Sequence, residues 1–286
     1  MDKKISKLIL GTVQFGLDYG INNDQGKPSY EECKNILDLA WESGIRTLDT
    51  AEVYGSSYEV ISKYIQETGN EFRIHTKFKK TPQSLKEFLS ETKEKLNTRN
   101  VDVVYFHSFS DFEKTKSEGF TFLDTDKAKI GVSAYSNDEV QIAIGSNEVD
   151  IIQLPLNLLD NRRVKNNLLE VAKANGKIVA TRSCFLQGLF FKELSRIPEN
   201  LSPLIESLKE IKTLASEKQA SIEEFAFNYP LALDEVDYML FGVDSLAQLK
   251  SNIDSMHFKI DNELLNSIES IKIINESLLN PVNWSP

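Results

Sequence analysis

The sequence predicts one α/β domain over residues 1–286, a (β/α)8 TIM barrel followed by an extra C-terminal helix and tail. Short apolar segments rich in β-branched residues recur along the whole chain, and amphipathic helical patterns separate them. Linkers, low-complexity tracts and shifts of composition do not interrupt this alternation. A barrel of this type uses about 250 residues, so it would fill nearly the whole chain. A doubly wound open sheet shares the alternation and is the alternative architecture.

Eight segments have the length and apolar character of buried parallel strands. They cover residues 8–10, 46–49, 73–77, 101–107, 129–133, 150–154, 177–181 and 238–241. The interval before the last strand is the longest and accommodates two helices, over residues 201–219 and 221–233. A helix over residues 262–274 and the tail that contains Trp284 lie outside the eight units.

The predicted helices carry start and stop signals. Six of them begin with a serine followed three residues later by Glu or Gln, which is the pattern of a capping box. The pairs are Ser29–Glu32, Ser56–Glu59, Ser84–Glu87, Ser136–Glu139, Ser221–Glu224 and Ser245–Gln248. After Ser84, helical spacing places one apolar face on Leu85, Phe88, Leu89, Thr92 and Leu96. Helices should end at Gly44, Gly69 and Gly176, because glycine readily adopts the left-handed C-cap conformation.

The charge balance limits the classes of partner. The chain carries 33 Lys and Arg against 43 Asp and Glu, a net charge of −10, which argues against nucleic acid and acidic membranes. No segment approaches the roughly 20 apolar residues of a transmembrane helix. Cys33 and Cys184 show neither metal-binding nor redox spacing, which favours a reducing compartment. We therefore expect a soluble, cytoplasmic protein without a metal site.

Chemically active side chains gather where three predicted strands end. Asp49 ends the second strand, Lys77 the third and His107 the fourth. Tyr54 follows Asp49 by five residues. Active sites of such barrels form at the C-terminal ends of the strands, so we expect these four side chains to meet. Strand alternation points His75 to the same side as Lys77, two residues deeper, where we expect a core histidine.

Together these four side chains favour proton transfer to a carbonyl oxygen. The unperturbed pKa of tyrosine is about 10, and a nearby lysine ammonium lowers it by stabilising the phenolate. Asp49 would keep Lys77 charged, and His107 would hydrogen-bond the carbonyl oxygen and orient it. Tyr54 would donate a proton as a hydride reaches the carbon. The hydride must come from a cofactor, because side chains do not supply one.

Two segments resemble motifs of the aldo/keto reductases. Residues 10–16 are similar to the first-strand motif of that family, and residues 44–55, Gly-Ile-Arg-Thr-Leu-Asp-Thr-Ala-Glu-Val-Tyr-Gly, to its most diagnostic motif. Lys77 and His107 fall where the family has the Lys and His of its catalytic tetrad. Residues 131–133, Gln153 and Asn157 resemble its fifth- and sixth-strand motifs. The resemblance covers essentially the whole chain.

The resemblance implies a TIM barrel that binds a nicotinamide dinucleotide without a Rossmann domain. The chain has no Gly-x-Gly-x-x-Gly motif and no P-loop, which also disfavours the open sheet. Tyr54 would be the general acid, tuned by Lys77 and Asp49, and His107 would orient the carbonyl. The implied cofactor-binding residues are Gly11, Thr12, Asp49, Ser133, Gln153, Arg182, Ser183, Phe185, Gly188, Val243, Ser245, Gln248 and Asn252. The implied partner is a small-molecule carbonyl or alcohol substrate, and the implied assembly a monomer or weak homo-oligomer.

Three features depart from the family pattern. Ala134 stands where the family often has Asn, and Arg182 where an aromatic ring usually stacks on the nicotinamide, although a flat guanidinium can also stack. At the adenosine end, Gln248 is neutral and Asp244 acidic where basic residues usually hold the 2′-phosphate of NADP. Lys250 remains within reach of that phosphate. NADP(H) is therefore the family default, and we predict good use of NAD(H).

Three functions remain open at this stage. A reductase of an aldehyde or ketone, with a small or sugar-like substrate, uses all four side chains. A non-catalytic nicotinamide-binding sensor or regulatory subunit on the same barrel would not need them together. A barrel aldolase would use Lys77 to form a Schiff base, which the neighbouring Tyr54 and the cofactor-binding pattern disfavour. Taken singly, Asp49 fits a turn cap and His107 a core or loop histidine. Trp284 is the tail residue expected near the mouth of the site.

Overall fold

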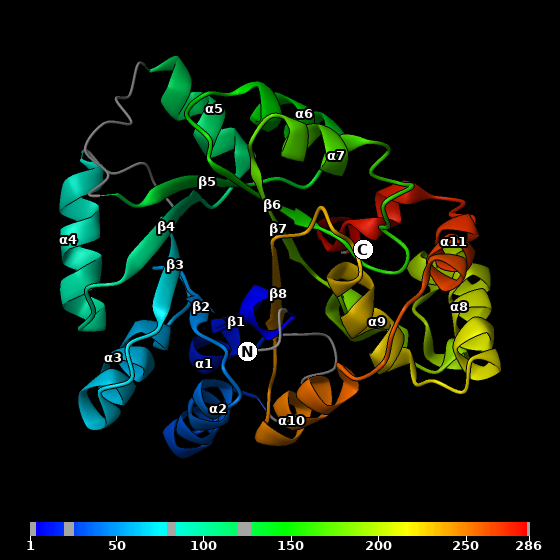
Figure 1. Cartoon of the computed structure of the whole chain (residues 1–286), viewed down its shortest axis with the longest axis horizontal. Coiled ribbons are helices and arrows are strands. Elements are labelled where there is room, and N and C mark those ends of the chain that lie inside the picture. The colour runs from blue at the N-terminus through cyan, green and yellow to red at the C-terminus, as the bar shows by residue number, and fades with distance from the viewer. Residues whose placement is uncertain (1–3, 20–25, 79–83, 119–126, 285–286) are drawn as a thin grey trace.

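The computed structural model describes residues 4–19, 26–78, 84–118 and 127–284. Eight parallel strands pair in chain order, and β1 pairs with β8 to close the barrel, so the predicted fold is confirmed over the open sheet (Figure 1). The strands are β1 (Leu8–Gly11), β2 (Thr47–Asp49), β3 (Arg73–Phe78), β4 (Val101–Phe106), β5 (Lys129–Ser133), β6 (Ile151–Pro155), β7 (Ile178–Arg182) and β8 (Tyr238–Gly242). Each strand begins and ends within one residue of its predicted segment.

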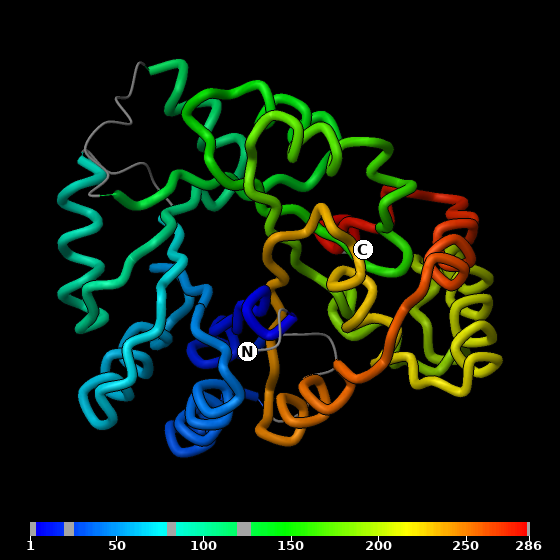
Figure 2. Tube along the Cα trace, viewed as in Figure 1, coloured from blue at the N-terminus to red at the C-terminus, as the bar shows by residue number. Residues whose placement is uncertain are grey.

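Helices lie around the strands, and the chain can be followed from one unit to the next in Figure 2. They are α1 (Val13–Gly16), α2 (Tyr30–Glu42), α3 (Ser57–Thr68), α4 (Leu85–Leu96), α5 (Phe109–Ser117), α6 (Asn137–Gly145), α7 (Leu168–Ala174), α8 (Ile205–Glu217), α9 (Ile222–Leu231), α10 (Leu246–Ser255) and α11 (Asn262–Ser270). As predicted, two helices, α8 and α9, precede β8, and α11 lies outside the eight units. None of the described helices is long and apolar enough to cross a membrane.

Short 3₁₀ helices complete the secondary structure. They are η1 (Ile5–Lys7), η2 (Leu186–Phe191), η3 (Leu194–Arg196), η4 (Glu199–Leu204), η5 (Glu276–Leu279) and η6 (Pro281–Trp284). Three of them, η2 to η4, belong to the long connection between β7 and α8, which begins at the end of the barrel where the strands terminate. This connection supplies several of the residues that line the site described below.

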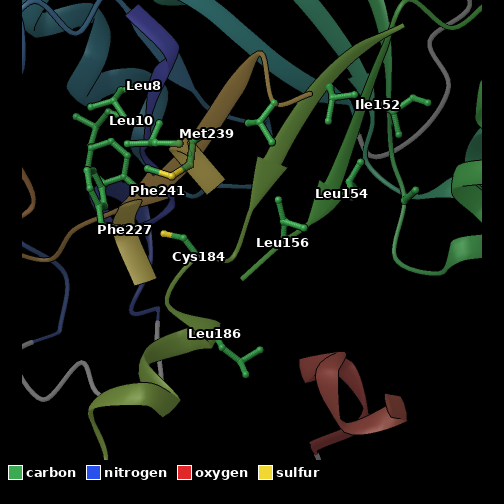
Figure 3. Close-up of a cluster of buried hydrophobic side chains, with 14 of the residues drawn as sticks. Leu8, Leu10, Ile152, Leu154, Leu156, Cys184, Leu186, Phe227, Met239 and Phe241 are labelled. Carbon is green, nitrogen blue, oxygen red and sulfur yellow. The ribbon is translucent and has the colours of Figure 1, made fainter. Parts of the chain in front are cut away.

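The main apolar core fills the space between the barrel wall and the helices. Leu10 of β1 and Phe241 of β8 are neighbours in the register and lie beside Phe227 of α9 (Figure 3). The α4 helix buries the predicted face of Leu85, Phe88, Leu89, Thr92 and Leu96. A smaller cluster of Val103, Tyr105, Ile151 and Ala180 lies apart from the main core. Gly131 makes room for Tyr105, because a Cβ at Gly131 would lie 2.3 Å from its ring.

The predicted helix signals are confirmed at most positions. Five of the six serines accept a backbone N–H three residues further on. The reciprocal bond of a complete capping box is present at Ser136 and Ser221. Next to Ser245, the Gln248 side chain instead accepts the Asp244 N–H at 2.7 Å. The predicted stop glycines all have a positive φ, namely Gly44 (93°), Gly69 (72°) and Gly176 (71°).

Two predictions about helix ends are wrong. Ser56 makes no cap bond, because its φ of −88° and ψ of 19° are not those of an extended N-cap, and its hydroxyl accepts from Lys27 at 3.0 Å. The last helix ends at Ser270 rather than at residue 274. The buried side chain of Ile271 follows in extended backbone, and the next carbonyl, of Lys272, accepts from Ser207 at 2.8 Å. Tertiary contacts therefore end this helix before its sequence pattern does.

Candidate active site

A cleft of about 880 Å³ is lined by residues at the C-terminal ends of the barrel strands. Asp49, Tyr54, Lys77 and His107 all line it, so the structure brings together the four side chains predicted from three strand ends. The cleft also takes in the loop after β7 and the first turns of α10. We call the part of the cleft lined by Asp49, Tyr54, Lys77 and His107 the catalytic end, as the candidate site of the predicted proton transfer.

Lys77 and Asp49 form a buried ion pair at the catalytic end. Their side chains are 3% and 1% exposed, and the Lys77 ammonium donates a hydrogen bond to the Asp49 carboxylate. Gln153 donates its side-chain N–H to the other carboxylate oxygen at 3.1 Å. Burial works to lower the pKa of Lys77, but Asp49 and Tyr54 together raise it above its ordinary value. Lys77 is therefore charged at neutral pH.

The Tyr54 phenol lies against this pair and stays protonated. The Lys77 ammonium is 5.4 Å from the centre of the Tyr54 ring. Burial raises the pKa of Tyr54 above 10.0, and Lys77 lowers it only in part. The predicted direction of the Lys77 effect is thus correct, but desolvation outweighs it. Tyr54 consequently holds a proton that it can donate.

The loop that carries Tyr54 is fixed by close packing and by buried hydroxyl groups. Ser57 donates to Thr12 at 2.7 Å, and Thr12 in turn donates to the Asp49 carbonyl at 3.0 Å. Gly16 of α1 touches the loop directly, since a Cβ there would lie 1.7 Å from the Tyr54 carbonyl oxygen. These contacts connect the first strand end to the second. They hold the phenol at a defined position without using its hydroxyl.

His107 follows β4 and faces Tyr54 across the catalytic end. Their ring centres are 6.1 Å apart, and the ring planes are nearly perpendicular at 86°. Burial and the nearby Lys77 charge lower the pKa of His107 from its ordinary 6.5. The imidazole is therefore neutral at pH 7. A neutral imidazole has one N–H, which can donate to an oxygen placed between the two rings.

Most of the predicted cofactor-binding residues line the same cleft. These are Gly11, Thr12, Asp49, Ser133, Gln153, Arg182, Ser183, Phe185, Gly188, Gln248 and Asn252. Val243 does not line it, because its side chain is packed in the core at 1% exposure. Ser245 does not line it either, since its hydroxyl caps α10. Arg182 stacks on Tyr135, with its guanidinium carbon 4.0 Å from the ring centre.

The loop after β7 has an unusual backbone. Ser183, Leu186 and Gln187 have φ values of 63°, 46° and 52°, in the left-handed region that side chains disfavour, and Gly188 follows at 87°. Such conformations persist only where the surroundings hold them, and they concentrate at binding sites. The strain observed here lies along the wall of the cleft. It supports a binding role for this loop beyond that of a connection between elements.

Some lining residues escaped prediction, and Trp284, like Val243 and Ser245, does not line the cleft. Tyr19 and Tyr135 line the cleft although they are 43% and 37% exposed. Their only sequence signal is a large aromatic side chain in a loop after a strand. Trp284 is absent from the lining. Its indole N–H donates to the Leu278 carbonyl at 2.7 Å, so the tail packs on itself instead.

The described residues hold no cluster of three or more His, Cys, Asp or Glu side chains suited to a metal ion. Two charges, one phenol and one neutral imidazole are available at the catalytic end. This set can donate a proton to an oxygen and can stabilise the negative charge that develops on it.

Comparisons with known proteins agree with this arrangement. The model of the Aldo/keto reductase family matches residues 7–273. The aldo-keto reductase str7 of Strobilurus tenacellus is 23% identical over 274 residues, covering 85% of this chain and 82% of that protein. A D-threo-aldose 1-dehydrogenase of a Pseudomonas species is 21% identical over 304 residues, covering 86% and 89%. The holo form of an aldo-keto reductase from Bacillus halodurans superposes with a TM-score of 0.69 at 19% identity, covering 93% and 91%.

Proposed function

The chain belongs to the aldo/keto reductase family, and we propose that it is an NAD(P)H-dependent oxidoreductase that reduces the carbonyl group of an aldehyde or ketone to an alcohol. One observation carries the proposal. A protonated tyrosine, a charged lysine paired with a buried aspartate, and a neutral histidine meet at one end of a single cleft. Proton donation to a carbonyl oxygen uses each of these states.

The proposed mechanism assigns one task to each side chain. His107 donates its N–H to the substrate carbonyl oxygen and orients it. Tyr54 donates its phenolic proton to the same oxygen as negative charge develops there. The Lys77 ammonium stabilises the phenolate that remains, and Asp49 keeps that ammonium charged and in place. In the reverse direction the same groups accept the proton of an alcohol.

The lining of the cleft fits a nicotinamide dinucleotide. Its volume of about 880 Å³ lies in the range typical of ligand sites. The buried Gln14 side-chain oxygen has no hydrogen-bond partner and faces a cleft-lining glycine, Gly242, where a Cβ would lie 2.5 Å from the Gln14 amide. Gln14 fills the room that Gly242 leaves, and its unpaired oxygen in the cleft lining suits a ligand that brings an N–H or O–H donor. When bound, the dinucleotide supplies the hydride.

The residues that would hold the dinucleotide divide between the two ends of the cleft. Ser133 and Gln153 lie with the catalytic side chains and would hold the nicotinamide, and Arg182 would stack near it. The strained loop at Ser183 and Gly188 would follow the pyrophosphate. The first turns of α10 would then hold the adenosine. These assignments are proposals for the individual residues.

The substrate that we propose is small or sugar-like. The relative from Pseudomonas is described as a D-threo-aldose 1-dehydrogenase, which supports a sugar-like alcohol or carbonyl. The exposed rings of Tyr19, Tyr135 and Phe191 at the cleft are surfaces on which a sugar ring can stack. A Schiff-base aldolase is disfavoured, because Lys77 is charged and paired, whereas imine formation needs a neutral amine.

Replacement of Tyr54 by Phe tests the proposed function. We expect turnover of a panel of aldehydes, ketones and keto-sugars to fall by about 10²–10⁴-fold while dinucleotide binding persists. Tyr58→Phe is the matched control, because the Tyr58 hydroxyl contacts Thr76 and lies outside the cleft lining. Activity that survives Tyr54→Phe within about tenfold would contradict the proposed acid. Dinucleotide binding by a wild-type protein that turns over no member of the panel would favour the non-catalytic alternative.

A further inference from the structure

The end of the cleft that is lined by α9, the end of β8 and the start of α10 carries acidic side chains. Asp244, Gln248 and Glu223 line it, and the basic side chains that line the cleft are Lys77 and Arg182, from β3 and β7. Lys250, the nearby lysine of α10, is 72% exposed and pairs with Asp254 at 3.7 Å. Among the described lining residues, therefore, this end offers a ligand two carboxylates and no cation.

A third carboxylate, that of Glu32 from a different helix, lies behind the cleft lining at the start of α10. The α2 and α10 helices lie side by side (Figure 1), and Glu32 of α2 accepts the backbone N–H of Leu246, the first residue of α10, at 2.7 Å. The Ser245 hydroxyl accepts the Gln248 N–H at 3.3 Å, and the Gln248 side chain accepts the Asp244 N–H at 2.7 Å. The chain's own oxygens thus occupy three of the N–H groups at the start of α10, those of Asp244, Leu246 and Gln248, which a phosphate could otherwise use.

The position of this end matters if the protein binds a dinucleotide as proposed above. The hydride-donating ring must lie near Tyr54, where the carbonyl is protonated. The rest of the dinucleotide then extends along the cleft, and its adenosine half reaches the start of α10. NADP differs from NAD there by one phosphate on the adenosine ribose. That phosphate would bring negative charge close to Glu32 and Asp244.

We propose that Glu32 is a specificity-determining residue that favours NAD(H) over NADP(H), by placing its carboxylate on the first N–H of α10 where the additional phosphate of NADP would bind. The proposal rests on the proposed function. Glu32 acts in two ways. It removes a hydrogen-bond donor from the phosphate, and its charge cancels the positive potential at the helix N-terminus and repels a second anion. Asp244, which lines the same end of the cleft, adds to the repulsion.

Replacement of Glu32 by Gln separates the charge from the contact, because the amide oxygen of Gln can still accept the Leu246 N–H. Glu31→Gln is the matched control. It removes one negative charge from the preceding residue of α2, which makes no hydrogen bond to Leu246. Dissociation constants of NADH and NADPH are measured by calorimetric titration on the full chain, without substrate. This readout does not depend on turnover.

We expect the wild-type protein to bind NADH at least about tenfold more tightly than NADPH. Glu32→Gln should tighten NADPH by about five- to tenfold and leave NADH within about twofold, whereas Glu31→Gln should change neither by more than about twofold. The wild-type preference should also narrow as salt is added, because screening weakens the repulsion. This salt series tests the electrostatic argument even if the variant does not fold.

Three results would overturn the inference. These are a wild-type preference for NADPH, equal effects of Glu32→Gln and Glu31→Gln, and a preference that is insensitive to salt. Tight binding of both dinucleotides without discrimination would overturn the role of Glu32 but leave the proposed reductase intact. Binding of neither dinucleotide would overturn the proposed function as well. The titration therefore distinguishes the two failures.

Discussion

The most informative single change is Asp49→Asn, which keeps the shape of the side chain and removes its charge. The carboxylate accepts bonds from Lys77 and Gln153, and the two charged side chains are almost completely buried. Removal of one partner from a buried ion pair leaves the other charge uncompensated and costs about 3–5 kcal/mol. We expect about 3 kcal/mol, because the Asn oxygen keeps one hydrogen bond to Lys77.

The pH dependence of stability should also reverse. In the wild-type protein burial lowers the pKa of Lys77, but Asp49 and Tyr54 raise it above 10.5. The stabilisation is therefore complete below the unfolded-state pKa of lysine and is lost only as pH rises through the higher folded-state pKa. In Asp49→Asn burial prevails, and the folded-state pKa of Lys77 falls below the unfolded-state one. The free energy of unfolding of the variant then rises with pH between these two values.

Urea unfolding at about pH 7 and about pH 9 measures both effects. Asp160→Asn is the matched control, because Asp160 forms another buried ion pair, with Lys165 at 2.6 Å, and does not line the cleft. It should lose comparable stability but keep reductase activity within about threefold, whereas Asp49→Asn should lose about 10²-fold. A loss of less than about 1 kcal/mol for Asp49→Asn, or a pH slope like that of the wild type, would refute the reasoning.

Two further predictions concern the scaffold. Gly16→Ala should lower kcat by about tenfold or more, because its Cβ would collide with the Tyr54 carbonyl oxygen; Gly145→Ala, whose Cβ meets no atom within 4 Å, should leave kcat unchanged in the same steady-state assay. Ser136→Ala should lower the free energy of unfolding by about 1 kcal/mol, whereas Ser56→Ala should change it by less than about 0.5 kcal/mol. Equal losses in urea unfolding would contradict the capping assigned to these two serines.

The strands and the meeting of the four side chains at the strand ends could be predicted from the sequence because their signals are local. A buried parallel strand is a short apolar run, and its last residue marks the catalytic end of a barrel, so Asp49 and Lys77 were placed without tertiary information. The four side chains meet because barrel closure is set by the number and order of the strands. The helix faces followed for the same reason, since helical spacing alone defines the buried face of α4.

Contacts between segments that are distant in the sequence could not be predicted from it. Glu32 carries a capping signal for α2, and nothing near it in sequence indicates that its carboxylate reaches the start of α10. The helical pattern of α11 continues past Ser270, but the burial of Ile271 ends the helix. Trp284 was expected at the cleft because it is a large aromatic residue in the tail, yet its indole finds a partner within that tail. In each case a tertiary partner decides between alternatives that the local sequence leaves equal.

Aromatic and imidazole rings fill the interior of the barrel below Lys77, and they affect the strength of the charge interactions at the catalytic end. His75 lies two residues before Lys77 on β3, and burial lowers its pKa to about 3, so it is uncharged. Its ring packs 6.0 Å from Tyr105 and 5.7 Å from Tyr238, and burial raises the pKa of Tyr105 well above 10.0. The buried rings of His75 and Tyr105 are neutral, and such an apolar, water-poor interior lowers the local dielectric constant and strengthens nearby charge interactions. In the proposed mechanism, the attraction between Lys77 and a developing Tyr54 phenolate would therefore be stronger here than at a solvated surface, and the packing of the barrel core would support proton transfer.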